Sequence, residues 1–375
     1  MTADARLLTI ELLKQSLTPI AALLDDPHVT DIQIFGHQRV YVKRQGRRPE
    51  MTGIEWLSGE DLLHVAKTIG RFIKRRLDND NPILDSRLPD GSRVNIVIPP
   101  CAPQAYISIR LFPKFFLNVD DLIRFGSLDA VGAKILESII RLGRNTIISG
   151  GTGSGKTTLL NVLCSYIPHD DLVVTVEDSR EIRIGNDLWA PLESKKALHQ
   201  DDKEITLRDL VRNSLRMYPK WVIVGEVRGA EALDLVRAFN TGHCGMGTIH
   251  ANSVYDALLA MENLILQSGL EMSARAVRDM VARAVRVVVQ VDQLPDDSRK
   301  IVEIAEVLGL DYDRSSNYPP YMMNTLYRYN FQCYDDGGRA VGSFESANRP
   351  QFFSDLARIR NYEPPDCWLN GGCNA

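Results

Sequence analysis

Cysteine is scarce in this sequence and is not spaced for metal binding. Six cysteines occur among 375 residues. Cys367 and Cys373 are close together, but no second pair accompanies them. Zinc sites in sequences normally show two such pairs, so we expect no zinc site. A reduced, cytoplasmic chain fits this usage best.

Long apolar runs are also missing. No stretch approaches the roughly 20 apolar residues of a membrane span. Asp4 and Glu11 interrupt the N-terminal apolar residues, which argues against a signal peptide. We therefore expect any membrane association to be peripheral.

An excess of basic charge is absent as well. Lys and Arg total 44 against 48 Asp and Glu, a net charge of -4. Nucleic-acid-binding proteins usually carry a basic domain or stripe. The short basic run at 74–76 is flanked by acids and is typical of a solvated helix end. We expect no direct nucleic-acid binding.

The first third of the chain predicts an N-terminal domain of mixed α/β type over residues 1–113. Alternating apolar residues predict strands at 31–35, 39–44, 93–98 and 106–112. Ser58, followed by Glu60 and Asp61, predicts the capped start of a helix that runs to Leu77.

A linker is predicted over 114–130, followed by a larger domain over 131–310. There strands and helices alternate, which predicts a mostly parallel sheet covered on both faces. After residue 311 the composition changes, and we expect a small C-terminal appendage over 311–375 with a helix at 351–361.

The stretch GGTGSGKTT at 150–158 matches the phosphate-loop pattern, with a strand before it and a helix after it. Glycines allow backbone N–H groups to face phosphates at a helix N-terminus. Lys156 would reach the β and γ phosphates of ATP, and Thr157 would ligate Mg²⁺. The predicted nucleotide-binding residues are Gly150, Gly151, Thr152, Gly153, Ser154, Gly155, Lys156, Thr157 and Thr158.

The buried-strand pattern VIVGE ends in a single acid, Glu226, with Gly225 where many ATPases carry a metal-holding acid. Another strand, VVTVED, ends in Glu177 and Asp178. The carboxyl ends of parallel strands share one edge of a sheet, so these acids can face Glu226 across a nucleotide. We expect Glu177 or Asp178 to hold Mg²⁺ through water, and Glu226 to activate the attacking water.

Two histidines flank the strand pattern GTIH. His250 ends it, where it can donate to a γ-phosphate oxygen; His243 precedes it, and we expect it to position Glu226. Phosphoryl transfer also uses arginines that stabilise developing charge. Arg93 and Arg110 lie on N-terminal strands that a hinged linker could bring to a nucleotide.

Four ordered motifs resemble one family: GGTGSGKTTLLN, VTVEDSREI, VIVGEVRGAEALD and NTGHCGMGTIHANS. The chain is similar over roughly residues 15–310 to the traffic ATPases of type II and type IV secretion, type IV pili and tight-adherence pili. The N-terminal third most resembles the tight-adherence and conjugal-transfer branches, and residues 311–375 match weakly.

The resemblance implies a RecA-like second domain and a cytoplasmic homo-hexamer at the inner face of the inner membrane, acting on a platform protein. It also implies that Glu177 and Asp178 form an acidic box, that Glu226 is the catalytic base, that His250 belongs to a histidine box, and that Arg93 and Arg110 contact phosphate. We expect a motor ATPase for pilus assembly or for protein or nucleoprotein secretion. A RecA-like DNA translocase or helicase, or an assembly scaffold with little turnover, are the alternatives.

Overall fold

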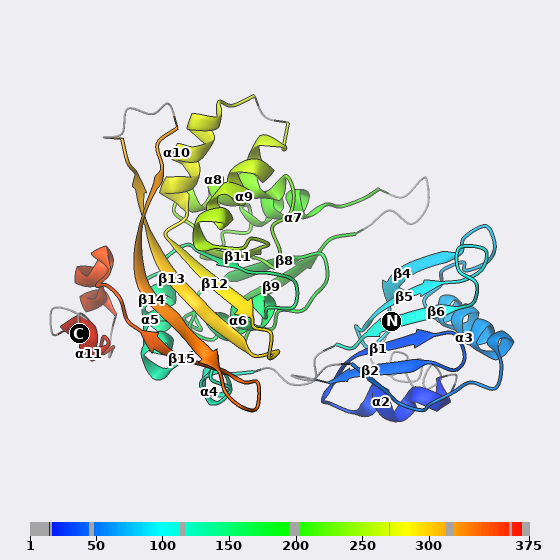
Figure 1. Cartoon of the computed structure of the whole chain (residues 1–375). Coiled ribbons are helices and arrows are strands. Elements are labelled where there is room, and N and C mark those ends of the chain that lie inside the picture. Colours follow the sequence, from blue (N-terminus) through cyan, green and yellow to red (C-terminus); the bar gives the residue numbers. More distant parts are fainter. Residues whose placement is uncertain are drawn as a thin grey trace. The chain divides into compact units, whose positions relative to one another are not determined.

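The computed structural model describes residues 15, 17–44, 49–112, 117–195, 203–269, 271–312, 318–359 and 362–369. The chain divides into two compact units, Met1–Phe115 and Phe116–Ala375 (Figure 1). None of the helices in these described ranges is long and apolar enough to cross a membrane.

The N-terminal unit contains a six-stranded antiparallel sheet in the order β3-β2-β1-β6-β5-β4. Its elements are η1 Thr18–Ile20, α2 Ala21–Asp25, β1 Val29–Phe35, β2 Val40–Arg44, β3 Glu50–Met51, α3 Gly59–Phe72, β4 Ile83–Arg87, β5 Arg93–Val97 and β6 Tyr106–Arg110. Helix α3 packs on one face of this sheet through a shared apolar core. The predicted mixed α/β domain is confirmed.

Helix α3 begins where the sequence predicts it, because the Ser58 hydroxyl accepts the backbone N–H of Asp61. It ends earlier than predicted, at Phe72. Lys74 adopts a left-handed backbone, φ 57°, and the N–H of Arg75 turns back onto the carbonyl of Gly70. The basic run therefore follows the helix and lies outside it.

The second unit is built on a nine-stranded sheet in the order β15-β14-β13-β12-β7-β11-β10-β8-β9. Its strands are β7 Thr146–Ser149, β8 Val173–Glu177, β9 Trp189–Glu193, β10 Trp221–Val224, β11 Cys244–Ile249, β12 Val287–Gln293, β13 Arg299–Leu310, β14 Tyr321–Tyr334 and β15 Ala340–Glu345. From β12 to β9 the strands pair parallel, and β12 to β15 pair antiparallel. The predicted mostly parallel sheet is confirmed.

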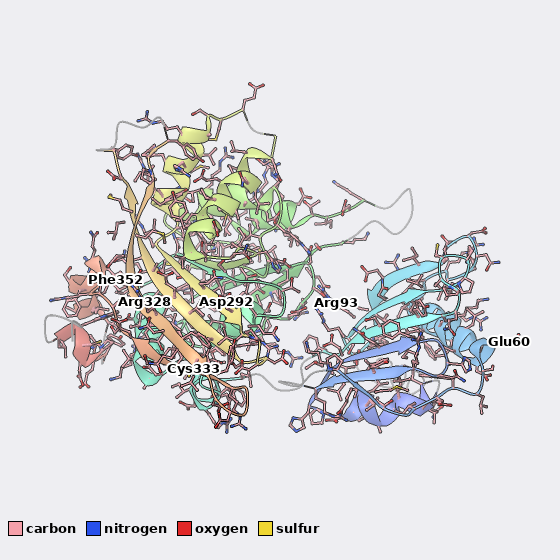
Figure 2. All side chains as sticks on the ribbon, viewed as in Figure 1. Glu60, Arg93, Asp292, Arg328, Cys333 and Phe352 are labelled. Atoms are coloured by element: carbon pink, nitrogen blue, oxygen red, sulfur yellow. The ribbon has the colours of Figure 1, made fainter. Side chains whose placement is uncertain are left out.

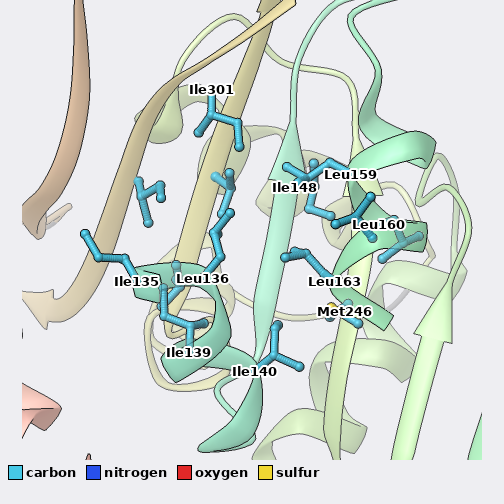
Figure 3. Packing of buried hydrophobic residues seen from close by; sticks show 14 of the residues in the cluster. Ile135, Leu136, Ile139, Ile140, Ile148, Leu159, Leu160, Leu163, Met246 and Ile301 are labelled. Atoms are coloured by element: carbon cyan, nitrogen blue, oxygen red, sulfur yellow. The ribbon is translucent and has the colours of Figure 1, made fainter. Parts of the chain in front are cut away.

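Helices cover both faces of this sheet (Figure 1). They are α4 Val119–Arg124, α5 Ala130–Arg141, α6 Lys156–Cys164, α7 Leu207–Ser214, α8 Glu231–Asn240, α9 Val254–Leu266, α10 Ala274–Ala284, η2 Gln351–Arg358 and α11 Asp366–Leu369. Successive strand residues face opposite sides, so Ile148 packs with α5 and α6 (Figure 3) while Ile147 packs with α8, α9 and α10. The helices packed on both faces fix the position of the sheet edge that carries the phosphate loop.

The C-terminal stretch differs from its prediction in secondary structure. Strand β14 pairs with β13 across the predicted boundary at residue 310, and β15 pairs with β14. The segment predicted as a helix at 351–361 is the 3₁₀ helix η2, Gln351–Arg358. Phe352 and Leu356 of η2 are buried in the core on the α5 side, so this segment is held by tertiary contacts rather than by regular helix hydrogen bonds.

Candidate ATP-hydrolysis site

The phosphate loop joins buried strand β7 to helix α6. Gly150, Gly153 and Gly155 have φ of 157°, 78° and 99°, which side chains with a Cβ rarely adopt. A Cβ on Gly150 would also collide with the carbonyl oxygen of Val291 in β12. Glycine is therefore required both for the turn and for the close approach of the neighbouring strand.

Lys156 opens α6 and folds back over the loop. Its Nζ donates to the carbonyls of Gly150 at 3.0 Å and Gly151 at 2.8 Å. Burial lowers the pKa of this ammonium, and the charge of Glu226 opposes that shift. The Lys156 ammonium is thus held at the centre of the phosphate loop, where the charge of the Glu226 carboxylate acts on it.

The remaining residues of the predicted loop lie around this lysine. Ser154 is buried, and its hydroxyl donates to the carbonyl of Gly151 at 2.9 Å. Thr157 and Thr158, in the first turn of α6, are partly exposed, and Thr152 is exposed. The structure therefore gathers all the predicted nucleotide-binding residues of 150–158 at one strand–helix junction.

Glu177, Glu226 and His250 come to the same edge of the sheet as the loop. Val224 pairs with Val176 in β8, and Ile249 pairs with Ser149 in β7, so all these strands end together. This is the arrangement that the order of the motifs predicts for parallel strands.

A chain of polar contacts crosses this edge. Lys156 Nζ lies 3.3 Å from His250 Nδ1, and His250 Nε2 lies 3.1 Å from Glu226 Oε1. Since the ammonium can only donate, Nδ1 accepts and Nε2 carries the proton toward Glu226. Arg228 lies 3.8 Å from the other oxygen of Glu226 and forms an ion pair with Asp178. The side chains of Glu226 and His250 remain 35% and 46% exposed, so a substrate can reach both.

Glu177 is buried at the end of β8. Its Oε1 accepts the backbone N–H groups of Glu181 at 2.8 Å and Ile182 at 2.9 Å. Its Oε2 is buried and has no hydrogen-bond partner among the residues that the structure describes. Burial raises the pKa of Glu177 to about 7, and the two backbone bonds oppose the shift. An unpaired carboxylate oxygen at the edge of an ATP site fits a water or a hydrated cation.

Gly225 gives Glu177 its space. The N–H of Gly225 donates to the carbonyl of Val176 at 2.9 Å, which places the two strand ends side by side. A Cβ on Gly225 would lie 3.0 Å from Cγ of Glu177, tighter than most real Cβ contacts, so Glu177 would have to shift by a few tenths of an ångström. The acid missing from position 225 thus has a counterpart on the neighbouring strand, packed against the glycine.

Asp178 is engaged differently from Glu177. It pairs with Arg228 and accepts the hydroxyl of Ser194 at 2.9 Å. Within the part of the chain that the structure describes, no group of three or more His, Cys, Asp or Glu residues could hold a metal by itself. A divalent cation here would therefore depend on water and on the phosphates of its nucleotide.

Two arginines near this site are not predicted from the sequence. Arg228 follows Glu226 by two residues, and buried Glu231 accepts the backbone N–H groups of Arg228 and Gly229, which fixes that turn. Arg299, at the start of β13, donates from Nε to the carbonyl of Gly153 at 2.9 Å. Arg228 could have been considered, because it lies in the VIVGEVRG motif. Arg299 lies far along the chain, and no local sequence pattern indicates a role for it.

A hollow of about 510 Å³ lies beside the loop. Gly151, Thr152 and Ser154 form one side, and the end of β12 forms the other with Asp292, which Figure 2 labels. Asn252, two residues after His250, also lines it. The loop is therefore open to solvent on the side of the β12–β13 hairpin.

The structure does not bring His243 to this edge. It precedes β11, whereas His250 follows it, so the strand separates the two. Nδ1 of His243 contacts the hydroxyl of Thr241 at 3.2 Å and the carbonyl of Ala238 at 3.3 Å, at the end of α8. The prediction that His243 positions Glu226 is wrong, because the two residues sit at opposite ends of parallel strands.

Arg93, which Figure 2 labels, and Arg110 both belong to the N-terminal unit. They are cross-strand neighbours on β5 and β6, and their register places them on one face of the sheet. Arg110 donates from Nε to Asp31 on β1 at 3.1 Å, and its side chain is 64% exposed. Their contact with phosphate stays a prediction.

Comparison with known proteins agrees with this geometry. The family described as Type II/IV secretion system protein matches residues 14–318. A Mycobacterium tuberculosis (strain CDC 1551 / Oshkosh) protein named "Putative conjugal transfer protein MT3759" is 32% identical over 311 residues, 81% of this chain and 87% of that protein. The type IV secretion system protein VirB11 of Brucella suis is 28% identical over 307 residues, 73% of this chain and 84% of that protein.

Among solved structures, the Legionella pneumophila ATPase DotB has the same fold. Its TM-score is 0.56 at 20% identity, over 76% of this chain and 79% of that chain. A RecA-like sheet with a phosphate loop, and with a glutamate and a histidine at the same edge, defines a nucleotide-binding P-loop ATPase. The chain belongs to the Type II/IV secretion system protein family and is an ATPase of that family.

Proposed function

We propose that this protein is a motor ATPase in which Glu226 activates water for attack on the γ-phosphate of ATP. The contact chain from Lys156 through His250 to Glu226 carries the proposal, because it places a phosphate-binding cation and a carboxylate base on either side of one histidine. The base is partly exposed, as it must be to reach water.

The neighbouring residues have separate roles in this proposal. His250 donates from Nε2 and orients Glu226 in the absence of phosphate. Arg228 holds Asp178 beside Glu226 and keeps the acidic strand end in register with the base. The backbone N–H groups of residues 151–158 and the ammonium of Lys156 bind the phosphates.

Mg²⁺ fits this site through Thr157 and Glu177. The Thr157 position is that of the metal-binding hydroxyl in phosphate loops, and Glu177 offers a buried, unpaired oxygen. When bound, the cation would neutralise negative charge on the phosphates. Asp178 is already paired, so its predicted part in metal binding is indirect.

Residues 1–113 and 131–310 act in this proposal as two domains joined by the linker 114–130. Arg93 and Arg110 would reach a nucleotide of their own chain or of a neighbour when the linker closes. The chain would assemble as a cytoplasmic homo-hexamer and act on an inner-membrane platform protein of a conjugation, secretion or pilus machine. The names of its relatives, a conjugal transfer protein and a type IV secretion system protein, support a role in transfer or secretion.

The test is the ATPase rate per subunit as a function of protein concentration, with mass read by light scattering in the same samples. We expect the specific rate to climb as a species of about six subunits appears. A flat rate from a monomer would remove the ring and the trans-acting arginines. Tight single-stranded DNA binding at physiological salt would instead favour the translocase, and negligible turnover would favour the scaffold.

A further inference from the structure

The start of β13 lies between two segments that are far apart in the sequence. Arg299 donates from Nε to the carbonyl of Gly153 in the phosphate loop at 2.9 Å. Its Cδ also lies 3.1 Å from where a Cβ on Gly155 would be. The next residue, Lys300, donates from Nζ to the carbonyl of Gly126 at 2.6 Å. Gly126 lies in the turn between α4 and α5, inside the second unit.

The contact of Arg299 has a direct consequence for phosphate binding. A peptide unit is planar and trans, so fixing the direction of the Gly153 carbonyl fixes the following N–H in the opposite direction. That N–H belongs to Ser154 and points across the loop, toward the carbonyl of Gly151 at 3.4 Å. Arg299 therefore fixes the orientation of the Gly153–Ser154 peptide in the middle of the phosphate loop.

The contact of Lys300 holds the α4–α5 turn in place against β13. Lys300 is only 9% exposed, and its ammonium lies 5.4 Å from the ring centroid of Tyr329 in β14. The N–H of Ile301 donates to the carbonyl of Ser127 at 2.9 Å. Two residues after Ser127, the carboxylate of Asp129 accepts a hydrogen bond from the hydroxyl of Tyr327, which is fully buried. Residues 126–129 are thus bound to β13 and β14 rather than only to their own helices.

The β12–β13 hairpin, which leads into Arg299, is held by several contacts. Gln293 and Arg299 pair across its base, and the N–H of Leu294 donates to the carbonyl of Ser298 at 2.8 Å. Asp296 at its tip accepts the N–H of Ala340, the first residue of β15, at 2.7 Å. We therefore expect the start of β13 to move together with Arg299 as a rigid segment.

We propose that Arg299 and Lys300 couple the phosphate loop to the α4–α5 turn at residues 126–129. This inference rests on the proposed binding of nucleotide at the loop. Arg299 is a positioning residue for the loop, and Lys300 transmits the state of β13 to that turn. Adjacent strand residues point to opposite faces, so one strand start contacts both segments at once.

Amide hydrogen exchange of the full-length protein, with and without saturating Mg-ADP, tests the coupling. We expect nucleotide to slow exchange at Gly126, Ser127, Asp129 and Ile301 at least threefold in the wild type. Arg299→Ala should lose this protection even when a fluorescent ADP analogue shows the site to be saturated. Lys300→Met should also lose it, with its nucleotide KM within about twofold of wild type.

The matched control is Arg328→Ala, which removes an exposed arginine from neighbouring β14 (Figure 2) and should keep the protection. Steady-state kinetics give a second readout: Arg299→Ala should raise KM for ATP about tenfold with kcat nearly unchanged, and Arg299→Lys should restore part of the affinity. If Arg299→Ala unfolds, Arg299→Gln replaces it in both measurements.

Full protection in a saturated Arg299→Ala protein would overturn the coupling. So would an absence of protection in a wild-type protein that binds and hydrolyses ATP. A wild-type protein that neither binds nor hydrolyses ATP would instead remove the proposed function, and the inference with it.

Discussion

Gly225 and Glu177 face each other at the ends of adjacent parallel strands, and a Cβ on the glycine would lie 3.0 Å from Cγ of the glutamate. A second acid after β10 would therefore require the side chain of Glu177 to shift by a few tenths of an ångström. The single acid in the VIVGE motif has a second acid beside it on β8, and this is the carboxylate that we propose for the metal.

Gly225→Asp should be destabilising although it restores the more common two-acid pattern. Overpacking costs about 1–3 kcal/mol, and a second carboxylate beside Glu177 adds repulsion. We expect a lower Tm and at least a tenfold lower ATPase rate. The double variant Gly225→Asp with Glu177→Ser should recover the Tm, because it vacates the space. If Gly225→Asp has the same Tm as the wild type, the two strand ends can move apart without loss of stability.

Glu226→Gln should bind ATP but hydrolyse it slowly. Removing a general base typically costs 10²–10⁴ in rate, so we expect a fall in kcat of at least about 100-fold with nucleotide affinity kept. Lys156→Ala should lose ATP binding, since it removes the cation at the centre of the loop. Phosphate release and nucleotide-binding titrations separate the two, and near-normal turnover in Glu226→Gln would disprove the base assignment.

The stability of the nucleotide-free, metal-free protein should depend on Glu177 and pH. Burial raises the pKa of Glu177 from 4.5 to about 7, so the folded chain keeps a proton that the unfolded chain releases. The stability from this protonated form is fully present below pH 4.5 and is lost as pH rises to about 7, a change of about 3 kcal/mol.

Glu177→Gln removes that dependence because the amide stays neutral. We expect the variant to unfold at a higher temperature than wild type at pH 8 and to differ little at pH 5. Thermal unfolding in EDTA at both pH values measures this, with Glu193→Gln, an exposed strand end on β9, as the control. Equal differences at both pH values would mean that Glu177 titrates normally.

Arg278 and Glu262 form a buried ion pair between α10 and α9, at 2.9 Å and 2% and 1% exposure. Tyr321 also donates to Glu262, and the Arg278 guanidinium lies 3.4 Å from the ring centroid of Tyr318. These contacts attach the start of β14 to the helices. Replacing one charge of such a pair typically costs about 3–5 kcal/mol, because the other charge stays buried.

Arg278→Met should therefore unfold at a much lower denaturant concentration than wild type. Arg278→Met combined with Glu262→Leu should recover most of the loss, since no buried charge remains unpaired. Urea unfolding measures both, and the ATPase rate of the folded fraction should stay near that of wild type. If the double variant unfolds at as low a urea concentration as the single variant, the pair stabilises the protein through more than its charge–charge interaction.

Much of the site could be predicted because its signals are local. The glycines of 150–155 and Lys156 follow a strand and open a helix, and phosphate binding needs no distant residue to be inferred. Glu226 and His250 were predicted from their places at strand ends, since parallel strands share an edge. His243 was misplaced because a histidine before a strand and one after it look equally close in the sequence.

Local sequence patterns are enough to predict the phosphate loop, the alternation of strands and helices, and the edge where Glu177, Glu226 and His250 meet. These follow from backbone preferences and apolar periodicity, which act between near neighbours in the chain. Only the folded chain shows that Gly225 packs against Glu177, that Arg299 contacts Gly153, and that β14 and β15 extend the sheet. Those contacts depend on strand order and register, because they join residues that only packing brings together.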